Sequence, residues 1–233
     1  MKDRDLIFDR KTHLLYSKAV RRVIQKELRA DYPEAEAEAL WEQTQREYVK
    51  ILDLIPNLGG KKNMQAQAVY DCAALFAYYT AVPDKPTLEE FGRMNEELFL
   101  PDFTRLRFVN LNNHLLMNAA WHIWNHLAKV NRRHRRDWPG NYLMEMVPVP
   151  EGAKYLFHRC PIAELAKKLG YTHLMGPVCN PDYPMIRAMH GRLIRTETCA
   201  FGACCDFWIV GSESRFVREH PERKSETGFL YNE

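Results

Sequence analysis

The sequence predicts an α+β protein in which a helical N-terminal half packs on a small antiparallel β-sheet with short helices in the C-terminal half. Two observations lead to this fold class. Apolar residues recur at helical spacing as far as about residue 136. Beyond that point the apolar runs are short, rich in β-branched and aromatic residues, and bounded by proline and glycine, as in hairpin strands. Because these strands follow one another without long helices between them, we expect them to pair antiparallel.

Five helical segments are expected in the first half. The apolar residues of each fall on one face, which predicts helices over 13–28, 34–55, 63–81, a segment that begins after Thr87, and 103–136. Thr87 and Glu90 have the spacing of a capping box, in which each side chain accepts a hydrogen bond from the backbone amide of the other. The last segment is long, and we expect it to break near 110–113.

Strands and short helices are expected in the second half. The strand-like segments are 142–149 and 154–159, which form a hairpin, and 192–200 and 205–210. Pro161 and Gly170 bound one short helix, and Asn180 or Asp182 caps another. The chain is therefore divided into a mainly helical part (1–137), an α+β part (138–218) and a polar, loosely ordered tail (219–233), all within one domain, 1–233.

Composition excludes several classes of protein. The 33 Lys and Arg residues nearly balance the 30 Asp and Glu residues, which argues against the polybasic surface of a nucleic-acid-binding protein. No apolar run reaches the roughly 18 residues that cross a bilayer, and the N-terminus has no apolar signal core. We expect a cytoplasmic protein with a small-molecule substrate and neither a nucleic acid nor a membrane as partner. A homo-oligomer is compatible with the sequence.

The cysteines are the unusual feature of the composition. Five of the six lie between Cys160 and Cys205. Without an export signal, reduced thiols are expected in place of disulfides. Their spacing matches no familiar zinc or iron–sulfur pattern, so neither a metal nor a cofactor is predicted. Taken singly, each cysteine is as well explained by a small buried apolar side chain, and Cys72 in particular is expected to be helix core.

Three of these cysteines come at the start of secondary structure or next to an acid. Cys160 precedes a helix, whose free amides favour a thiolate, and His158 lies two residues before it. Cys179 is followed by Asp182, and Cys205 by Asp206. If these segments converge, the thiols and carboxylates surround one pocket together with His158 or His190 and an arginine from Arg187, Arg192 or Arg195.

Two other patterns favour ordinary surfaces over sites. His122 and His126 have the spacing of a metal pair on a helix with His114, but no carboxylate accompanies them. The basic run 132–136 falls at a helix C-terminus, where cations are favoured by the helix dipole.

The order of the cysteine motifs resembles that of a known family. Cys160-Pro161 opens a helix that ends at Leu169-Gly170; Cys179 follows with Asp182-Tyr183; Gly202 then leads to Cys205-Asp206-Phe207. This order is similar to that of the L-2-amino-thiazoline-4-carboxylic acid hydrolase family. Cys204 stands where the family more usually has an acidic or polar residue, so we do not expect it to be a shared site residue.

The resemblance implies hydrolytic opening of a small cyclic amidine or isothiourea acid at a C–N bond. Such a reaction needs a nucleophile, an acid for the leaving nitrogen, an anion for the amidine and a cation for the carboxylate. The expected catalytic residues are Cys160, Cys179, Asp182, Cys205, Asp206, His158 and His190, and the expected substrate-binding residues are Arg187 and Arg195. In these roles the aspartates hold the amidine, Cys160 or Cys179 attacks or positions water, the histidines move protons, and an arginine grips the carboxylate.

Two alternatives remain open at the level of sequence. The last cysteine-bearing strand is also similar to that of vinyl-reductase-type domains, which implies a regulatory module that binds a small apolar ligand without catalysis. A helical interaction protein would instead expose its aromatic stretches, Tyr78-Tyr79 and 121–124, although such stretches are more often core.

Overall fold

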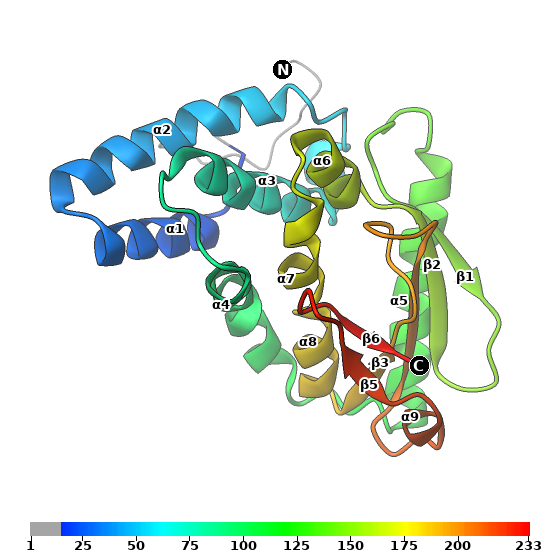
Figure 1. The fold of residues 1–233 in the computed structure, drawn as a ribbon. Coiled ribbons are helices and arrows are strands. Elements are labelled where there is room, and N and C mark those ends of the chain that lie inside the picture. The colour runs from blue at the N-terminus through cyan, green and yellow to red at the C-terminus, as the bar shows by residue number, and fades with distance from the viewer. Residues whose placement is uncertain (1–14) are drawn as a thin grey trace.

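A computed structural model describes residues 15–233, apart from the side chains of residues 61 and 100–104. Figure 1 shows a helical half and a half that contains the strands. The helical half consists of α1 (Lys18–Asp31), α2 (Glu34–Leu52), the 3₁₀ turn η1 (Gly60–Lys62), α3 (Ala66–Ala81), α4 (Leu88–Leu106) and α5 (His114–Arg133). The second half consists of β1 (Leu143–Val147), β2 (Ala153–Arg159), α6 (Pro161–Leu169), η2 (Thr172–Leu174), α7 (Met175–Cys179), α8 (Asp182–Ala188), β3 (Gly191–Ile194), β4 (Cys205–Gly211), α9 (Phe216–Glu219), β5 (Glu222–Lys224) and β6 (Leu230–Asn232).

The predicted helices are confirmed, and capping side chains set several of their ends. Ser17 accepts a hydrogen bond from the Val20 amide, so α1 begins at Lys18. The predicted start of this helix at residues 13 and 14 lies outside the described residues. The Thr87–Glu90 capping box is present at the start of α4. The expected break near 110–113 separates α4 from α5, because the Asn113 side chain caps the new helix.

The four main strands form one antiparallel sheet in the order β1-β2-β4-β3. The predicted hairpin is β1–β2, and β4 pairs with its second strand so that Tyr155 lies opposite Phe207. Alternate residues face opposite sides. Tyr155 and Phe207 lie on the side that carries the main core, whereas Trp208 and Val210 lie on the other side with α9 and its Phe216.

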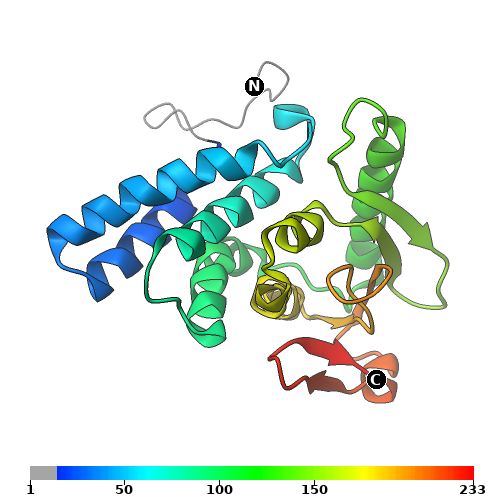
Figure 2. The ribbon, with the colours of Figure 1, turned by 45° about the horizontal axis from the view of Figure 1, so that its top comes forward.

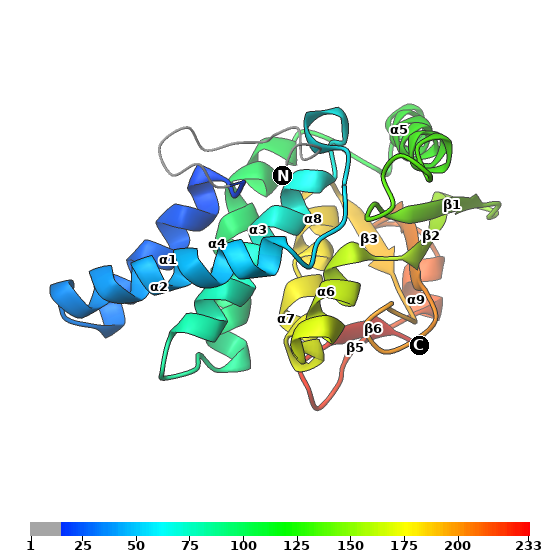
Figure 3. The ribbon, with the colours of Figure 1, turned by 90° about the horizontal axis from the view of Figure 1, so that it is seen from above.

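Helices α6, α7 and α8 form a column between α1–α4 and the sheet in both Figure 1 and Figure 2. Figure 3 shows α5 above β1 and β2, and there Trp124 contacts the ring of Tyr155. Tyr78 is buried in the core, as expected of an aromatic stretch on a helix. None of the helices within residues 15–233 combines the length and apolar character needed to cross a membrane.

The predictions for the end of the chain need two corrections. The strand predicted over 192–200 ends at Ile194, because residues 196 and 197 turn their backbone amides toward Asp206. The segment 219–233, expected to be a loosely ordered tail, contains the last residue of α9 and the antiparallel hairpin β5–β6. Asn232 is buried, and its backbone amide donates to the Arg195 carbonyl at 2.7 Å, which ties the hairpin to the body of the protein.

Candidate functional site

A cavity of about 370 Å³ lies where α3 and the α6–α8 column meet the sheet. Its volume falls in the range of small-molecule sites, roughly 300–1,000 Å³. Most lining residues are apolar or aromatic. The residues with ionisable or hydroxyl groups are Cys72, Tyr142, Tyr155, Cys160, Cys179, Asp182, Arg195 and Cys205. Residues from five segments of the chain, 64–72, 99, 142–162, 175–186 and 195–207, therefore converge on one space.

Five of the nine sequence-predicted site residues line this cavity. Cys160 is the N-cap residue of α6, Cys179 ends α7, and Asp182 begins α8. Arg195 directly follows β3, and Cys205 begins β4. Each of them lies at the end of an element, where the chain changes direction and can bring a polar side chain to the edge of the apolar core.

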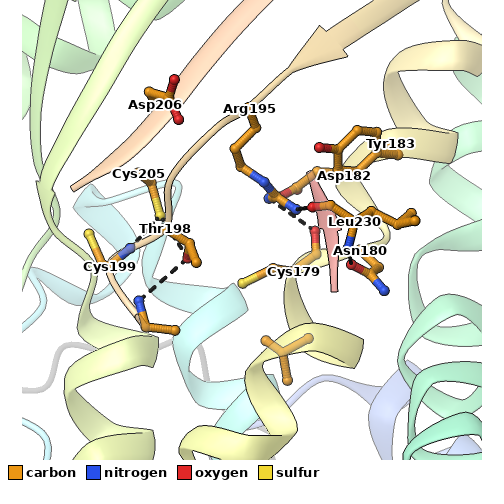
Figure 4. A network of polar contacts seen from close by, with 12 residues as sticks. Cys179, Asn180, Asp182, Tyr183, Arg195, Thr198, Cys199, Cys205, Asp206 and Leu230 are labelled. Carbon is orange, nitrogen blue, oxygen red and sulfur yellow. Dashed lines mark hydrogen bonds and ion pairs between the residues drawn. The ribbon is translucent and has the colours of Figure 1, made fainter. Parts of the chain in front are cut away.

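The Arg195–Asp182 pair forms one wall of the cavity. Arg195 Nη1 lies 3.1 Å from Asp182 Oδ2 and 3.3 Å from the Cys179 carbonyl oxygen, and Nη2 donates to the Leu230 carbonyl at 3.3 Å (Figure 4). The Arg195 side chain is fully buried, whereas a third of the Asp182 side chain is exposed. Asp182 therefore presents its carboxyl group to the cavity, and Arg195 supports it from behind.

The ionisation of this pair follows from its surroundings. Burial raises the pKa of Asp182, and the Arg195 guanidinium offsets only part of that rise. A guanidinium does not lose its proton in proteins. Arg195 lies over the rings of Tyr183, Phe207 and Phe229, at 4.9–5.5 Å, so its charge is held by aromatic faces as well as by Asp182.

Cys205 is the thiol in the most favourable surroundings for ionisation. The neighbouring Cys199 thiol, together with the Thr198 hydroxyl and the Cys199 amide, lowers the pKa of Cys205 to about 7. The Cys199 amide donates to Cys205 Sγ at 3.1 Å, and Thr198 Oγ1 lies 3.3 Å from the same sulfur (Figure 4). These contacts favour the thiolate of Cys205, which is the nucleophilic form of cysteine.

The remaining cavity thiols and phenols stay protonated. Burial raises the pKa of Cys160 to about 12, so the expectation that the α6 N-terminus makes Cys160 a thiolate is not met. Burial likewise raises the pKa of Cys72 and Cys179, and of Tyr142 and Tyr155. These groups act as neutral hydrogen-bond donors toward anything that occupies the cavity.

Four predicted site residues lie outside the cavity lining. His158 is exposed on the other face of β2, with Nε2 2.9 Å from Glu145 Oε2. Arg187 pairs with Glu222 at the surface. His190 is an exposed turn residue with a positive φ of 55°. Asp206 is buried on the outer face of the sheet, where it accepts hydrogen bonds from Thr196 and Glu197.

Some cavity residues were not among the sequence-based candidates. Cys72, expected to be only helix core, lines the cavity from α3. Tyr155 carried a usable signal, because period-2 alternation along β2 puts it on the core side and His158 on the opposite side. No sequence signal pointed to Tyr142, or to Cys199 beside Cys205, since only tertiary contacts bring them to the site.

Neither the second groove nor any acidic or histidine cluster among the described residues offers comparable groups for catalysis. A groove of about 970 Å³ between α4 and the β5–β6 hairpin is lined by residues that include no cysteine, and its Arg93 and Arg187 already pair with Glu27 and Glu222. In residues 15–233, no group of three or more His, Cys, Asp or Glu side chains has a metal-binding arrangement.

A family model for L-2-amino-thiazoline-4-carboxylic acid hydrolase matches residues 73–209, more than half of the chain. The chain belongs to the L-2-amino-thiazoline-4-carboxylic acid hydrolase family. Comparison with curated proteins and with solved structures found no match. Within the family match lie Cys160, Cys179, Asp182, Arg195 and Cys205, whereas the β5–β6 hairpin that contacts Arg195 follows it.

Proposed function

We propose that this family member is a hydrolase that opens a small cyclic amidine or isothiourea acid at a C–N bond inside the 370 Å³ cavity. One observation carries the proposal: a thiol whose pKa is lowered to about 7 and a carboxyl group held by a buried guanidinium line the same cavity. Strongly perturbed ionisable groups that share a pocket are typical of catalytic sites.

In the proposed first step, the Cys205 thiolate attacks the amidine carbon of the ring. The new S–C bond forms, the electron pair of the C=N bond moves to nitrogen, and collapse of this adduct breaks the C–N bond to the ring nitrogen. That nitrogen leaves with a proton taken from Asp182, whose raised pKa allows it to carry one. The product is a ring-opened chain attached to Cys205 through its amidine carbon.

In the proposed second step, water adds to the same carbon and expels the Cys205 thiolate. Asp182, now ionised, accepts a proton from the water, and the carbon keeps the oxygen as a carbamoyl group. Cys205 and Asp182 return to their starting states, so the reaction consumes one water. Arg195 has no exposed surface and acts as a positioning residue for Asp182.

The carboxylate of the substrate is assigned to neutral donors. Tyr142 and Tyr155 line the cavity, their phenols stay protonated, and no other side chain of the described residues is bonded to their hydroxyls. Two phenol donors stabilise a carboxylate by hydrogen bonds without adding a second buried cation. Arg195, which the sequence suggested for this role, lies behind Asp182.

A ligand-binding module without catalysis is the second candidate, and the largely apolar lining of the cavity favours it. The two candidates differ in what the ionisable groups do. A binding module gains nothing from a thiolate with a lowered pKa, because burying a charge beside apolar walls is costly.

The test is turnover by the purified protein. Incubation with 2-amino-thiazoline-4-carboxylate, followed by chromatography of the products, should yield a carbamoyl-cysteine. Cys205→Ser should lower the rate by about 10⁴-fold or more, as removal of a covalent nucleophile does. Cys204→Ser is the matched control, since the Cys204 thiol hydrogen-bonds Glu197 outside the cavity lining. Equal rates for the two variants would reject Cys205 as nucleophile, and tight binding without turnover would favour the binding module.

A further inference from the structure

The proposed reaction uses only one end of the cavity. Cys179, Asp182 and Cys205 lie around Arg195 there (Figure 4), and Arg195 Nη1 donates to the Cys179 carbonyl and to Asp182. Besides Gln65, Cys72, Tyr142, Tyr155 and Cys160, the rest of the lining is contributed by apolar and aromatic side chains: Met64, Ala68, Phe99, Phe157, Ile162, Met175, Val178, Pro181, Met185, Ile186 and Phe207. A ring acid engaged at the polar end leaves this surface uncovered.

The α3 side of the cavity gives the direction of the apolar part. Cys72, Ala68 and Met64 line it at intervals of four residues, which places them on one side of α3 and the turn before it. At 1.5 Å per helical residue, Ala68 lies about 6 Å along the axis from Cys72, and Met64 lies in the turn before the helix. Met64 is 81% exposed, so this side of the cavity ends at the surface.

Helix α8 shows the same change of character. Asp182, its first residue, belongs to the polar end, and Met185 and Ile186, one turn later, belong to the apolar part. Phe99 from α4 lines the same space. Among the described lining residues, Asp182 has the only carboxyl group and Arg195 the only basic side chain. Gln65 is the polar residue beside Met64, and its Oε1 already accepts a hydrogen bond from Asn131.

We propose that the substrate carries an uncharged apolar arm, aliphatic or aromatic, which lies along Ala68 toward Met64 while the amidine ring reacts at Cys205. The assignment rests on the proposed function for the ring and adds the chemical class of its substituent. An apolar arm gains free energy by leaving water for this wall, whereas a charged arm would lose its hydration without finding a partner. The smallest ring acid would then be a poor substrate.

The experiment measures binding separately from turnover. Calorimetry on Cys205→Ser compares 2-amino-thiazoline-4-carboxylate with the same acid carrying a benzyl group on ring carbon 5. The benzyl compound should bind at least about tenfold more tightly, in line with what apolar pockets gain from added groups. Equal affinity, or binding of neither compound, would overturn the proposal.

Two pairs of variants locate the arm. In the Cys205→Ser background, Ala68→Phe should abolish the tighter binding of the benzyl compound and retain binding of the unsubstituted acid. Ala119→Phe, on the exposed side of α5, is the control and should change neither affinity. Met64→Ser, at the surface, should reduce the advantage without disturbing the fold, and Leu115→Ser, a comparably exposed apolar residue on α5, is its control.

The outcomes separate the two proposals. Tight, arm-dependent binding that Ala68→Phe removes, without turnover of either compound by the wild type, would reject the hydrolase and keep the apolar arm site. Turnover of the unsubstituted acid with no gain from the benzyl group would keep the hydrolase and reject the arm.

Discussion

Cys205 and Asp206 are neighbours in β4 but face opposite sides of the sheet. Cys205 faces the cavity, where the Cys199 thiol and Thr198 lower its pKa to about 7. Asp206 faces the outer side, where two backbone amides and the Thr196 hydroxyl occupy its carboxylate oxygens. The two faces of the sheet therefore have different roles. On the cavity face the ionisable Cys205 is accessible to a ligand, and on the outer face the Asp206 carboxylate fixes a loop.

Asp182 and Asp206 repeat this contrast. Asp182 pairs with the buried Arg195 and has a third of its side chain exposed, while Asp206 is 7% exposed, accepts hydrogen bonds from residues 196 and 197 and lies 4.0 Å from Lys154 Nζ. Since the loop that Asp206 holds also contains Thr198 and Cys199, the outer face supports the cavity face indirectly.

The sharpest test of the contrast replaces each aspartate by asparagine. Asp182→Asn should reduce kcat by about 10²-fold, because the proposed proton carrier is lost. Asp206→Asn, the matched control, keeps an acceptor for both amides and should leave kcat nearly unchanged. Steady-state kinetics checks both, and similar losses in the two variants would remove the distinction between the faces.

The C-terminal hairpin gives the next largest expected effect. Asn232 Oδ1 accepts from the Arg195 amide and from the Tyr183 hydroxyl, both at 3.0 Å. Asn232→Ala leaves these buried donors unpaired, at a cost of about 1–3 kcal/mol, and should lower kcat about tenfold by displacing Arg195 and hence Asp182. Asn232→Asp, which retains the acceptor, should recover most of kcat. A change in KM alone would contradict a positioning role.

A smaller effect is expected from the thiol that supports Cys205. Alkylation of Cys205 should accelerate as the pH rises through about 7, because the thiolate is the reactive form and the pKa of Cys205 is lowered to that value. Cys199→Ala removes the leading cause of the lowering, so the pKa of Cys205 should move up toward 9.0 and alkylation at pH 7 should slow. Alkylation should recover at higher pH.

Alkylation by iodoacetamide, followed by mass spectrometry at each pH, measures the Cys205 thiolate directly. Cys204→Ser serves as the control, since it removes a neighbouring thiol that is not a cause of the shift. An unchanged alkylation profile in Cys199→Ala would rule out the Cys199 thiol as the origin of the lowered pKa.

The smallest effect on the chemistry is expected on the outer face. Asp206→Ala leaves the amides of Thr196 and Glu197 without their acceptor, which should lower the melting temperature by roughly 5 °C. Because the loop that Asp206 holds carries Thr198 and Cys199, the pH at which Cys205 alkylates should rise only slightly above 7 in the folded protein. Calorimetry measures the melting temperature, and the alkylation profile measures the ionisation of Cys205. A melting temperature equal to that of the wild type would show that the Asp206 carboxylate does not stabilise the loop.

Several parts of the structure follow from local pattern. The Thr87–Glu90 box, the Pro161 and Gly170 ends of α6 and the β1–β2 hairpin were all predicted from residues close together in the chain. The exposed position of His158 could also have been predicted from the sequence. Alternation along β2 places His158 on the opposite face from Tyr155 and Phe157. The β5–β6 hairpin could not be predicted in this way, since Glu222–Lys224 is exposed at every residue and has no apolar alternation to reveal it.

By itself the sequence determined the fold class, the family and the short list of cysteines and aspartates, because periodicity, capping and motif order are local properties of the chain. The tertiary structure alone decided which of those residues meet and how they ionise. Cys160, at a helix start, has its pKa raised by burial, while Cys205 has its pKa lowered by the neighbouring Cys199. Both shifts depend on solvent exclusion and on neighbours that packing brings together, and neither is written in the spacing of residues.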